Sequence, residues 1–144
     1  MAHVLETGFE ILNRENPNGS PTVMGYNIIN GELRPASDGE TFESRNPAWS
    51  DDCLGVFPLS TKDDVHDALI SAREAFSQWS QTPAPTRGQI IGNMGRLLME
   101  HKDDIVRVEA REIGKTLKES AGEVQEAIDT CLFFQSEGRR LYGQ

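Results

Sequence analysis

Two carboxylates in the C-terminal third of the chain are spaced for acid–base chemistry. Glu123 and Glu126 are three residues apart. In a helix they lie on consecutive turns, and a pair of carboxyl groups can divide general acid and general base work. Exposed helix carboxylates are far commoner than catalytic ones. The spacing therefore favours a solvated helix face, with acid–base chemistry as the alternative.

The cysteines and histidines form no catalytic set. Cys131 falls on the apolar face of a predicted helix, and Cys53 follows two aspartates that disfavour its thiolate. They make no CxxC pair, which indicates a reducing compartment. His3 lies in a loose N-terminal stretch, while His66 and His101 lie on polar helix faces or ends, where solvated side chains are expected. The N-terminus lacks a basic segment followed by an apolar one, so we expect a cytoplasmic protein.

Glycines between Gly88 and Gly95 suggest a phosphate loop, since glycine lets backbone N–H groups approach an anion. The run follows a proline-rich linker instead of a strand. It also lacks both the G-x-G-x-x-G spacing and the terminal Lys-Ser/Thr of a P-loop. Close packing of two helices is therefore the predicted role of these glycines.

The whole chain has 144 residues, with 14 Lys+Arg against 23 Asp+Glu and a net charge of -9. Its length fits one domain. The acidic balance argues against binding nucleic acid or an anionic membrane surface. No apolar run approaches the roughly 18 residues that span a bilayer.

The first half of the chain predicts an arm followed by strands. The turn formers at 16–21 predict a flexible N-terminal arm over residues 1–23, with an ordered region over 24–144. Residues 26–33 read as a hairpin turning at Asn30-Gly31, and residues 41–45 and 54–59 read as strands around a turn at Asn46-Pro47. Together they predict a small antiparallel β element.

Four amphipathic helices should follow. Thr61 is placed to cap the first, whose apolar stripe includes Val65, Leu69 and Phe76 and which should stop before Pro83. A capping box from Thr86 to Gln89 predicts the start of the second helix. A break near 101–104 precedes a third helix that ends at Gly114, and the fourth begins near Leu117.

The order of several short motifs resembles the N-terminal region of the NAD(P)-dependent aldehyde dehydrogenase superfamily. The resemblance runs from about residue 26 to the last residue. Its motifs are Asn30-Gly31-Glu32, Asn46-Pro47-Ala48, Ala72-Arg73-Glu74-Ala75-Phe76 with Trp79, Arg87-Gly88, Gly114-Lys115 and Gly122-Glu123-Val124. Each is weak alone. Two positions depart from the family pattern, namely Leu33, where a tryptophan is usual, and Thr116, where a proline is common.

The resemblance implies an α/β fold, of which this chain is the opening part of the cofactor-binding domain, made mostly of amphipathic helices and a short β element. In the complete enzyme a cysteine thiolate attacks an aldehyde, a hydride passes to NAD or NADP, and a glutamate-activated water releases the carboxylate. The family's catalytic groups lie beyond the position of Gln144. We therefore expect an inactive N-terminal fragment with no cofactor bound to this chain alone.

The resemblance also implies four site residues. Glu123, and Ala127 one turn later, would lie at the substrate entrance, while the backbone at Arg45 and Glu112 would hold a monovalent cation. The Gly122-Glu123-Val124 run is similar to enzymes acting on aminoadipate semialdehyde. The C-terminal end is similar to enzymes acting on succinate or oxoglutarate semialdehydes, so the aldehyde stays open.

The expected partners are a small aldehyde substrate and further copies of the chain, as a homodimer or homotetramer. A non-catalytic helical interaction module is the alternative function. The apolar helix stripes discriminate the two, because a fragment leaves them uncovered whereas a self-sufficient module does not.

Overall fold

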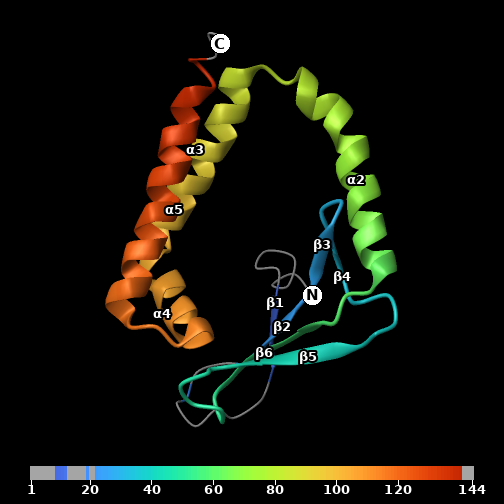
Figure 1. The fold of residues 1–144 in the computed structure, drawn as a ribbon. Coiled ribbons are helices and arrows are strands. Elements are labelled where there is room, and N and C mark those ends of the chain that lie inside the picture. The colour runs from blue at the N-terminus through green and yellow to red at the C-terminus, as the bar shows by residue number, and fades with distance from the viewer. Residues whose placement is uncertain (1–8, 13–18, 20–21, 141–144) are drawn as a thin grey trace. The chain divides into compact units, whose positions relative to one another are not determined.

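The computed structural model describes residues 9–12, 19 and 22–140, in a mixed α/β arrangement (Figure 1). The chain divides into two compact units, Met1–Ser77 and Gln78–Gln144, and each is described by itself. The strands are β1 (Phe9–Leu12), β2 (Thr22–Gly25), β3 (Asn27–Ile29), β4 (Glu32–Arg34), β5 (Thr41–Arg45) and β6 (Cys53–Pro58). The helices are α2 (Lys62–Gln81), α3 (Ala84–Glu100), α4 (Lys102–Ile113) and α5 (Leu117–Glu137).

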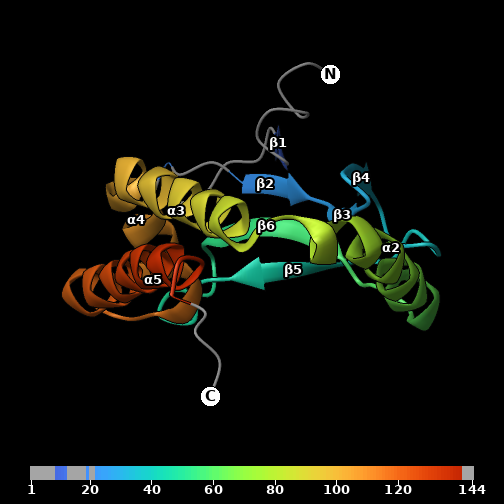
Figure 2. The ribbon, with the colours of Figure 1, turned by 90° about the horizontal axis from the view of Figure 1, so that it is seen from above.

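The larger sheet of the first unit is mixed, not antiparallel as expected. Its strand order is β1-β2-β6-β5, and Figure 2 shows β2, β6 and β5 beside one another. β1–β2 and β5–β6 are antiparallel, whereas β2 pairs with β6 in parallel, Val23 opposite Gly55. The β3–β4 hairpin and β5 separate these two strands along the chain. Strand periodicity predicts which face is buried, but it carries no information on pairing direction.

Two strands involve the stretch 1–23 that the sequence predicts to be a flexible arm. β1 lies wholly within it, and β2 begins at Thr22, whose side chain is fully buried and donates to the Cys53 carbonyl. The remaining positions of the predicted arm, apart from Gly19, lie outside the described residues.

The predicted hairpin at Asn30-Gly31 is confirmed. β3 and β4 pair with Ile29 opposite Glu32, leaving a two-residue loop. Both loop residues have positive φ, 54° at Asn30 and 76° at Gly31. A type I′ turn needs this conformation, and asparagine and glycine tolerate it best. The short-range chemistry of the loop was therefore sufficient to predict this element.

Helix α2 begins at the predicted cap. The Thr61 hydroxyl accepts from the backbone N–H of Asp63 at 3.2 Å and of Asp64 at 3.3 Å. The Asp64 carboxylate in turn accepts from the Thr61 backbone N–H at 2.7 Å and from the Ser37 N–H at 3.0 Å. This reciprocal pair satisfies N–H groups that the first helical turn leaves without partners.

The apolar stripe of α2 is exposed, as expected if the chain is a fragment of a larger fold. Val65 is 55% exposed, and Leu69 and Phe76 are each 65% exposed. The spacing did predict an amphipathic helix, because periodicity reports which side chains share a face. Whether that face is covered depends on what else is available to pack against it.

Helix α3 begins at Ala84, two residues before the predicted cap at Thr86. Pro83 is its N-cap, no side chain caps it, and a proline occupies the first turn. Proline suits this position because its fixed φ fits a helix and its missing N–H would have had no intrahelical partner. The capping box expected at Thr86 and Gln89 was therefore wrong, since the proline-led start displaced it.

Close packing of α3 against α5 explains the glycine run. Figure 1 shows the two helices side by side, and Gly88, Gly92 and Gly95 are buried. A Cβ added at Gly88 would lie 2.5 Å from the Gln135 carbonyl oxygen, and one at Gly95 would lie 2.8 Å from the Cys131 Cβ. The prediction of helix packing is confirmed, because only hydrogen fits at these positions.

The second unit has a small core between α4 and α5. Val106, Val124 and Ile128 are buried together, with Leu98, Ile105 and Ala121 packed against them. The chain breaks at His101, as predicted, and α4 ends at Gly114, which adopts φ 76°. Helix α5 starts with a capping box between Thr116 and Glu119. The caps fix the two ends of the turn that joins α4 to α5.

The reciprocal pair of Thr61 and Asp64 and the capping box of Thr116 and Glu119 should make the folded chain less stable in acid. Hydrogen bonds from Thr61, then from Ser37, lower the pKa of Asp64, and hydrogen bonds from Thr116 lower the pKa of Glu119. A lowered pKa in the folded state contributes stability that is present above about pH 4 and is lost as pH falls through the folded-state pKa. Urea unfolding at a series of pH values should show this loss, and the double variant Asp64→Asn/Glu119→Gln should show a shallower dependence.

The control is Asp63→Asn, which removes an exposed carboxylate from the same first turn of α2. Its pH dependence should follow that of the unaltered chain below pH about 4. An equally flattened profile in this control would show that the capping geometry is not the cause.

Candidate functional site

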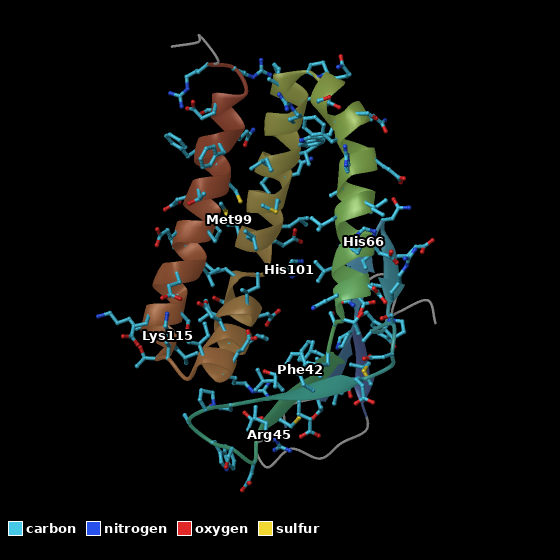
Figure 3. The ribbon with its side chains drawn as sticks, turned by 45° about the vertical axis from the view of Figure 1, so that its right-hand side comes forward. Phe42, Arg45, His66, Met99, His101 and Lys115 are labelled. Atoms are coloured by element: carbon cyan, nitrogen blue, oxygen red, sulfur yellow. The ribbon has the colours of Figure 1, made fainter. Side chains whose placement is uncertain are left out.

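Glu123 is held by two neighbours at the turn between α4 and α5. The Lys115 ammonium, labelled in Figure 3, donates to Glu123 Oε1, and both side chains remain partly exposed. Thr116 caps the helix that carries Glu123, while Gly114 reverses the chain just before Lys115. The local turn chemistry thus brings an acid and a base eight residues apart into an ion pair.

The carboxyl group of Glu109 on α4 completes this cluster. A hydrogen bond with Glu123 raises the pKa of Glu109, and desolvation and the nearby negative charge add to the effect. The hydrogen bond from Lys115, followed by that from Glu109, lowers the pKa of Glu123. Glu109 is therefore the member that holds a proton longer, and Glu123 is the fixed anion.

This arrangement changes the chemistry expected of Glu123. Sequence spacing offered Glu126 as its acid–base partner, whereas the structure pairs it with Lys115 and Glu109. A carboxylate whose pKa is lowered is a weak base and a stable negative charge. The cluster suits binding or orienting a polar group better than removing a proton. No periodic pattern links Glu109 to Glu123, so the sequence could not reveal this contact.

Ala127 lies one turn beyond Glu123 on α5. Both residues are exposed, so they share an accessible strip of this helix. Their placement at a substrate entrance stays a prediction.

The two residues predicted to supply a cation site belong to different units. The Arg45 guanidinium, at the end of β5 (Figure 3), donates to Glu43 Oε2 and to the Ser50 carbonyl at 2.8 Å. Glu112 is exposed near the end of α4. Over the ranges that the structure describes, no group of three His, Cys, Asp or Glu residues could hold a metal ion. A site formed by backbone oxygens stays a prediction.

The glycine-rich part of α3 does not fit a dinucleotide. Its glycines face α5, and a Cβ added at Gly88 or Gly92 would collide with Gln135. A pyrophosphate needs glycines at the turn between a strand and the start of a helix, where backbone N–H groups point at the ligand. Here the glycines lie inside a helix whose N–H groups bond within it. The residues of this segment therefore do not fit the pyrophosphate of a dinucleotide.

The burial of Cys131 and the exposure of the two described histidines match the roles predicted from the sequence. Cys53 and Cys131 are free and buried, and His66 and His101 are exposed. His3 lies outside the described residues. Among helices with described residues, none is long and apolar enough to cross a membrane.

The chain is similar to known proteins over most of its length. The model of the aldehyde dehydrogenase family matches residues 34–144. An alpha-ketoglutarate semialdehyde dehydrogenase of Haloferax volcanii is 38% identical over 117 residues, covering 81% of this chain and 24% of the relative. The NADP(+) succinate-semialdehyde dehydrogenase of Escherichia coli is also 38% identical, over 116 residues, with the same coverage. The chain thus spans about a quarter of the length of these curated relatives.

Solved structures agree with the sequence comparison. A crystal structure of an NADP-dependent enzyme of E. coli has a TM-score of 0.78 and 37% identity, covering 83% of this chain and 24% of the other. The NAD-dependent aldehyde dehydrogenase of Sinorhizobium meliloti has a TM-score of 0.80 and 24% identity over 84% of this chain, which supports the fold alone. These structures match the mixed α/β arrangement of the described residues.

Proposed function

The chain belongs to the aldehyde dehydrogenase family, and from that premise we propose that it forms part of an NAD(P)-dependent oxidoreductase that converts a semialdehyde to a carboxylate. The main support is the 38% identity to two relatives named for semialdehydes, each matched over about 81% of this chain. Their named substrates are small aldehydes that carry a carboxylate. Such a molecule is the substrate class proposed for the complete enzyme.

The proposed role of these 144 residues is scaffolding. The apolar stripe of α2 is uncovered, and the glycine run of α3 is used in packing against α5. Both features suit a segment that supports a larger fold, because exposed apolar faces mark surfaces that pack against further polypeptide. The homodimer or homotetramer expected for the complete enzyme stays a prediction.

We further propose that Glu123 and Ala127 line the substrate entrance. Glu123 carries a stable negative charge beside the Lys115 ammonium. Removing that negative charge leaves the ammonium with only the more distant attraction of Glu109 and Glu119, so the local potential becomes less negative and the approach of an anionic substrate is favoured. In a complete enzyme, Glu123→Gln should therefore lower KM for a carboxylate-bearing semialdehyde and leave kcat nearly unchanged, while Glu126→Gln on the same helix is the matched control. Equal KM values for the two variants would reject the entrance role.

The proposed function is tested with two proteins. The first is the 144-residue chain, assayed for NADH and NADPH formation with succinate, malonate, oxoglutarate and aminoadipate semialdehydes. The second is a chimera in which this chain replaces the 24% of the E. coli succinate-semialdehyde dehydrogenase that it matches. We expect reduced cofactor from the chimera and none from the chain. Activity in the 144-residue chain would reject the scaffolding role.

The helical interaction module has one observation in its favour, namely the core of Val106, Val124 and Ile128 within the second unit. A monomer that unfolds in one cooperative transition would support this alternative. Aggregation that is relieved in the chimera would support the dehydrogenase segment.

A further inference from the structure

Lys115 lies in the turn between α4 and α5 (Figure 3), and the backbone on both sides of it is fixed. Gly114 ends α4 in a left-handed conformation with φ 76°. Thr116 and Glu119 form the capping box that begins α5. A residue held between two caps has a defined backbone position. The Lys115 side chain therefore reaches Glu123 from a fixed point.

Three carboxyl groups surround the Lys115 ammonium, and all belong to the second unit. The hydrogen bond to Glu123, and then the negative charges of Glu123, Glu109 and Glu119, raise the pKa of Lys115. Glu119 and Glu123 are four residues apart on α5, a spacing at which like charges repel each other. The ammonium therefore offsets the repulsion among the acids at this end of α5.

The pairing of α4 with α5 does not depend on Lys115. A buried apolar core joins the two helices, and Lys102 Nζ on α4 also donates to Gln125 Oε1 on α5 at 2.6 Å. The side chains of Lys115 and Glu123, by contrast, are 36% and 46% exposed. An ion pair at this exposure adds little to stability. Its main effect is on where the Glu123 carboxylate lies.

The ion pair selects one position of the Glu123 carboxylate. A long side chain on an accessible helix face can adopt several rotamers, and a charge-assisted hydrogen bond favours one of them. We propose that Lys115 is a positioning residue of the substrate entrance, which holds the Glu123 carboxylate toward the turn and offsets its charge for an incoming anionic aldehyde. Without Lys115, the carboxylate would be free to extend into the entrance and repel such a substrate. This inference rests on the proposed function.

The first arm of the test measures Glu123 in the 144-residue chain by NMR titration of its side-chain carboxyl carbon. Lys115→Met should raise the pKa of Glu123, because the hydrogen bond from Lys115 is the largest cause that lowers it. Lys115→Arg keeps the positive charge and should keep that pKa low. Lys118→Met is the matched control, since Lys118 is exposed in the first turn of α5. A Glu123 pKa that does not respond to Lys115→Met would overturn the proposal.

The second arm measures steady-state kinetics in the chimera. Lys115→Met should raise KM for succinate semialdehyde about two- to fivefold, the range expected when a partly exposed ion pair is lost, with a smaller change in kcat. KM for butanal, a neutral aldehyde with the same number of carbon atoms, should stay the same. The rise should be much smaller in a chimera that already carries Glu123→Gln, because Lys115 acts through that carboxylate.

Two kinetic results would overturn the proposal. An equal rise in KM for butanal would indicate general damage to the fold. A rise of undiminished size in the Glu123→Gln background would indicate that the ammonium meets the substrate itself.

The two arms separate this inference from the proposed function. A Glu123 pKa that responds to Lys115→Met, together with a chimera that forms no NADPH, would support the positioning of Glu123 and count against the proposed function. A chimera that forms NADPH with a KM that does not respond to Lys115→Met would keep the proposed function and reject the inference.

Discussion

Ile128→Ala is expected to lower the free energy of unfolding of the second unit by about 2–5 kcal/mol. Ile128 is 1% exposed and packs with Val106 and Val124 between α4 and α5. Truncation removes three methyl or methylene groups from a core with few other members, and the cavity that remains loses its van der Waals contacts. Urea unfolding followed by circular dichroism measures the change.

Two further variants keep this measurement interpretable. Ile128→Val should cost only about 0.5–1.5 kcal/mol, so it reports on the core even if the alanine variant does not fold. Ile90→Ala is the matched control, because Ile90 is 47% exposed on α3. A control as damaging as Ile128→Ala would contradict the location of the core.

Gly88→Ala should be the next most damaging substitution, at about 1–3 kcal/mol. The added Cβ would lie 2.5 Å from the Gln135 carbonyl oxygen, a backbone atom that cannot move without shifting α5. This steric cost exceeds the roughly 0.5–1 kcal/mol that alanine gains over glycine inside a helix. Chemical unfolding of the 144-residue chain measures the net effect.

Gly122→Ala is the matched control for this substitution. Gly122 lies within α5, and a Cβ added there meets no atom within 4 Å. The control should therefore stabilise the chain by about 0.5–1 kcal/mol. The two substitutions are chemically identical, so effects of the same sign would show that α3 and α5 do not pack as described.

Local features of the fold could be predicted from the sequence, and features that depend on distant partners could not. Asn30-Gly31 predicted the hairpin and Gly114 predicted the end of α4, because each acts through its own backbone conformation. The parallel pairing of β2 with β6 escaped prediction, since it joins strands about 30 residues apart. Periodicity alone predicted the apolar stripe that contains Leu69, and the exposure of this stripe followed only from the expectation that the chain is a fragment.

In the candidate site too, a local motif could be predicted from the sequence and a contact between helices could not. Glu123 could be selected from the motif around Gly122, but the motif does not indicate its protonation. That property depends on Lys115, which the turn at Gly114 brings near, and on Glu109 of the neighbouring helix. Helix-to-helix contacts of this kind depend on how α4 and α5 pack. Sequence spacing reports only neighbours on the same helix.

We propose that this chain is a structural segment of a semialdehyde-oxidising enzyme. Its most direct test is the initial rate of NADPH formation from succinate semialdehyde by the chimera. The controls are the 144-residue chain and the E. coli enzyme lacking the 24% that this chain matches. We predict NADPH formation by the chimera and none by either part alone. A folded chimera that forms no NADPH, or a 144-residue chain that forms it unaided, would contradict the claim.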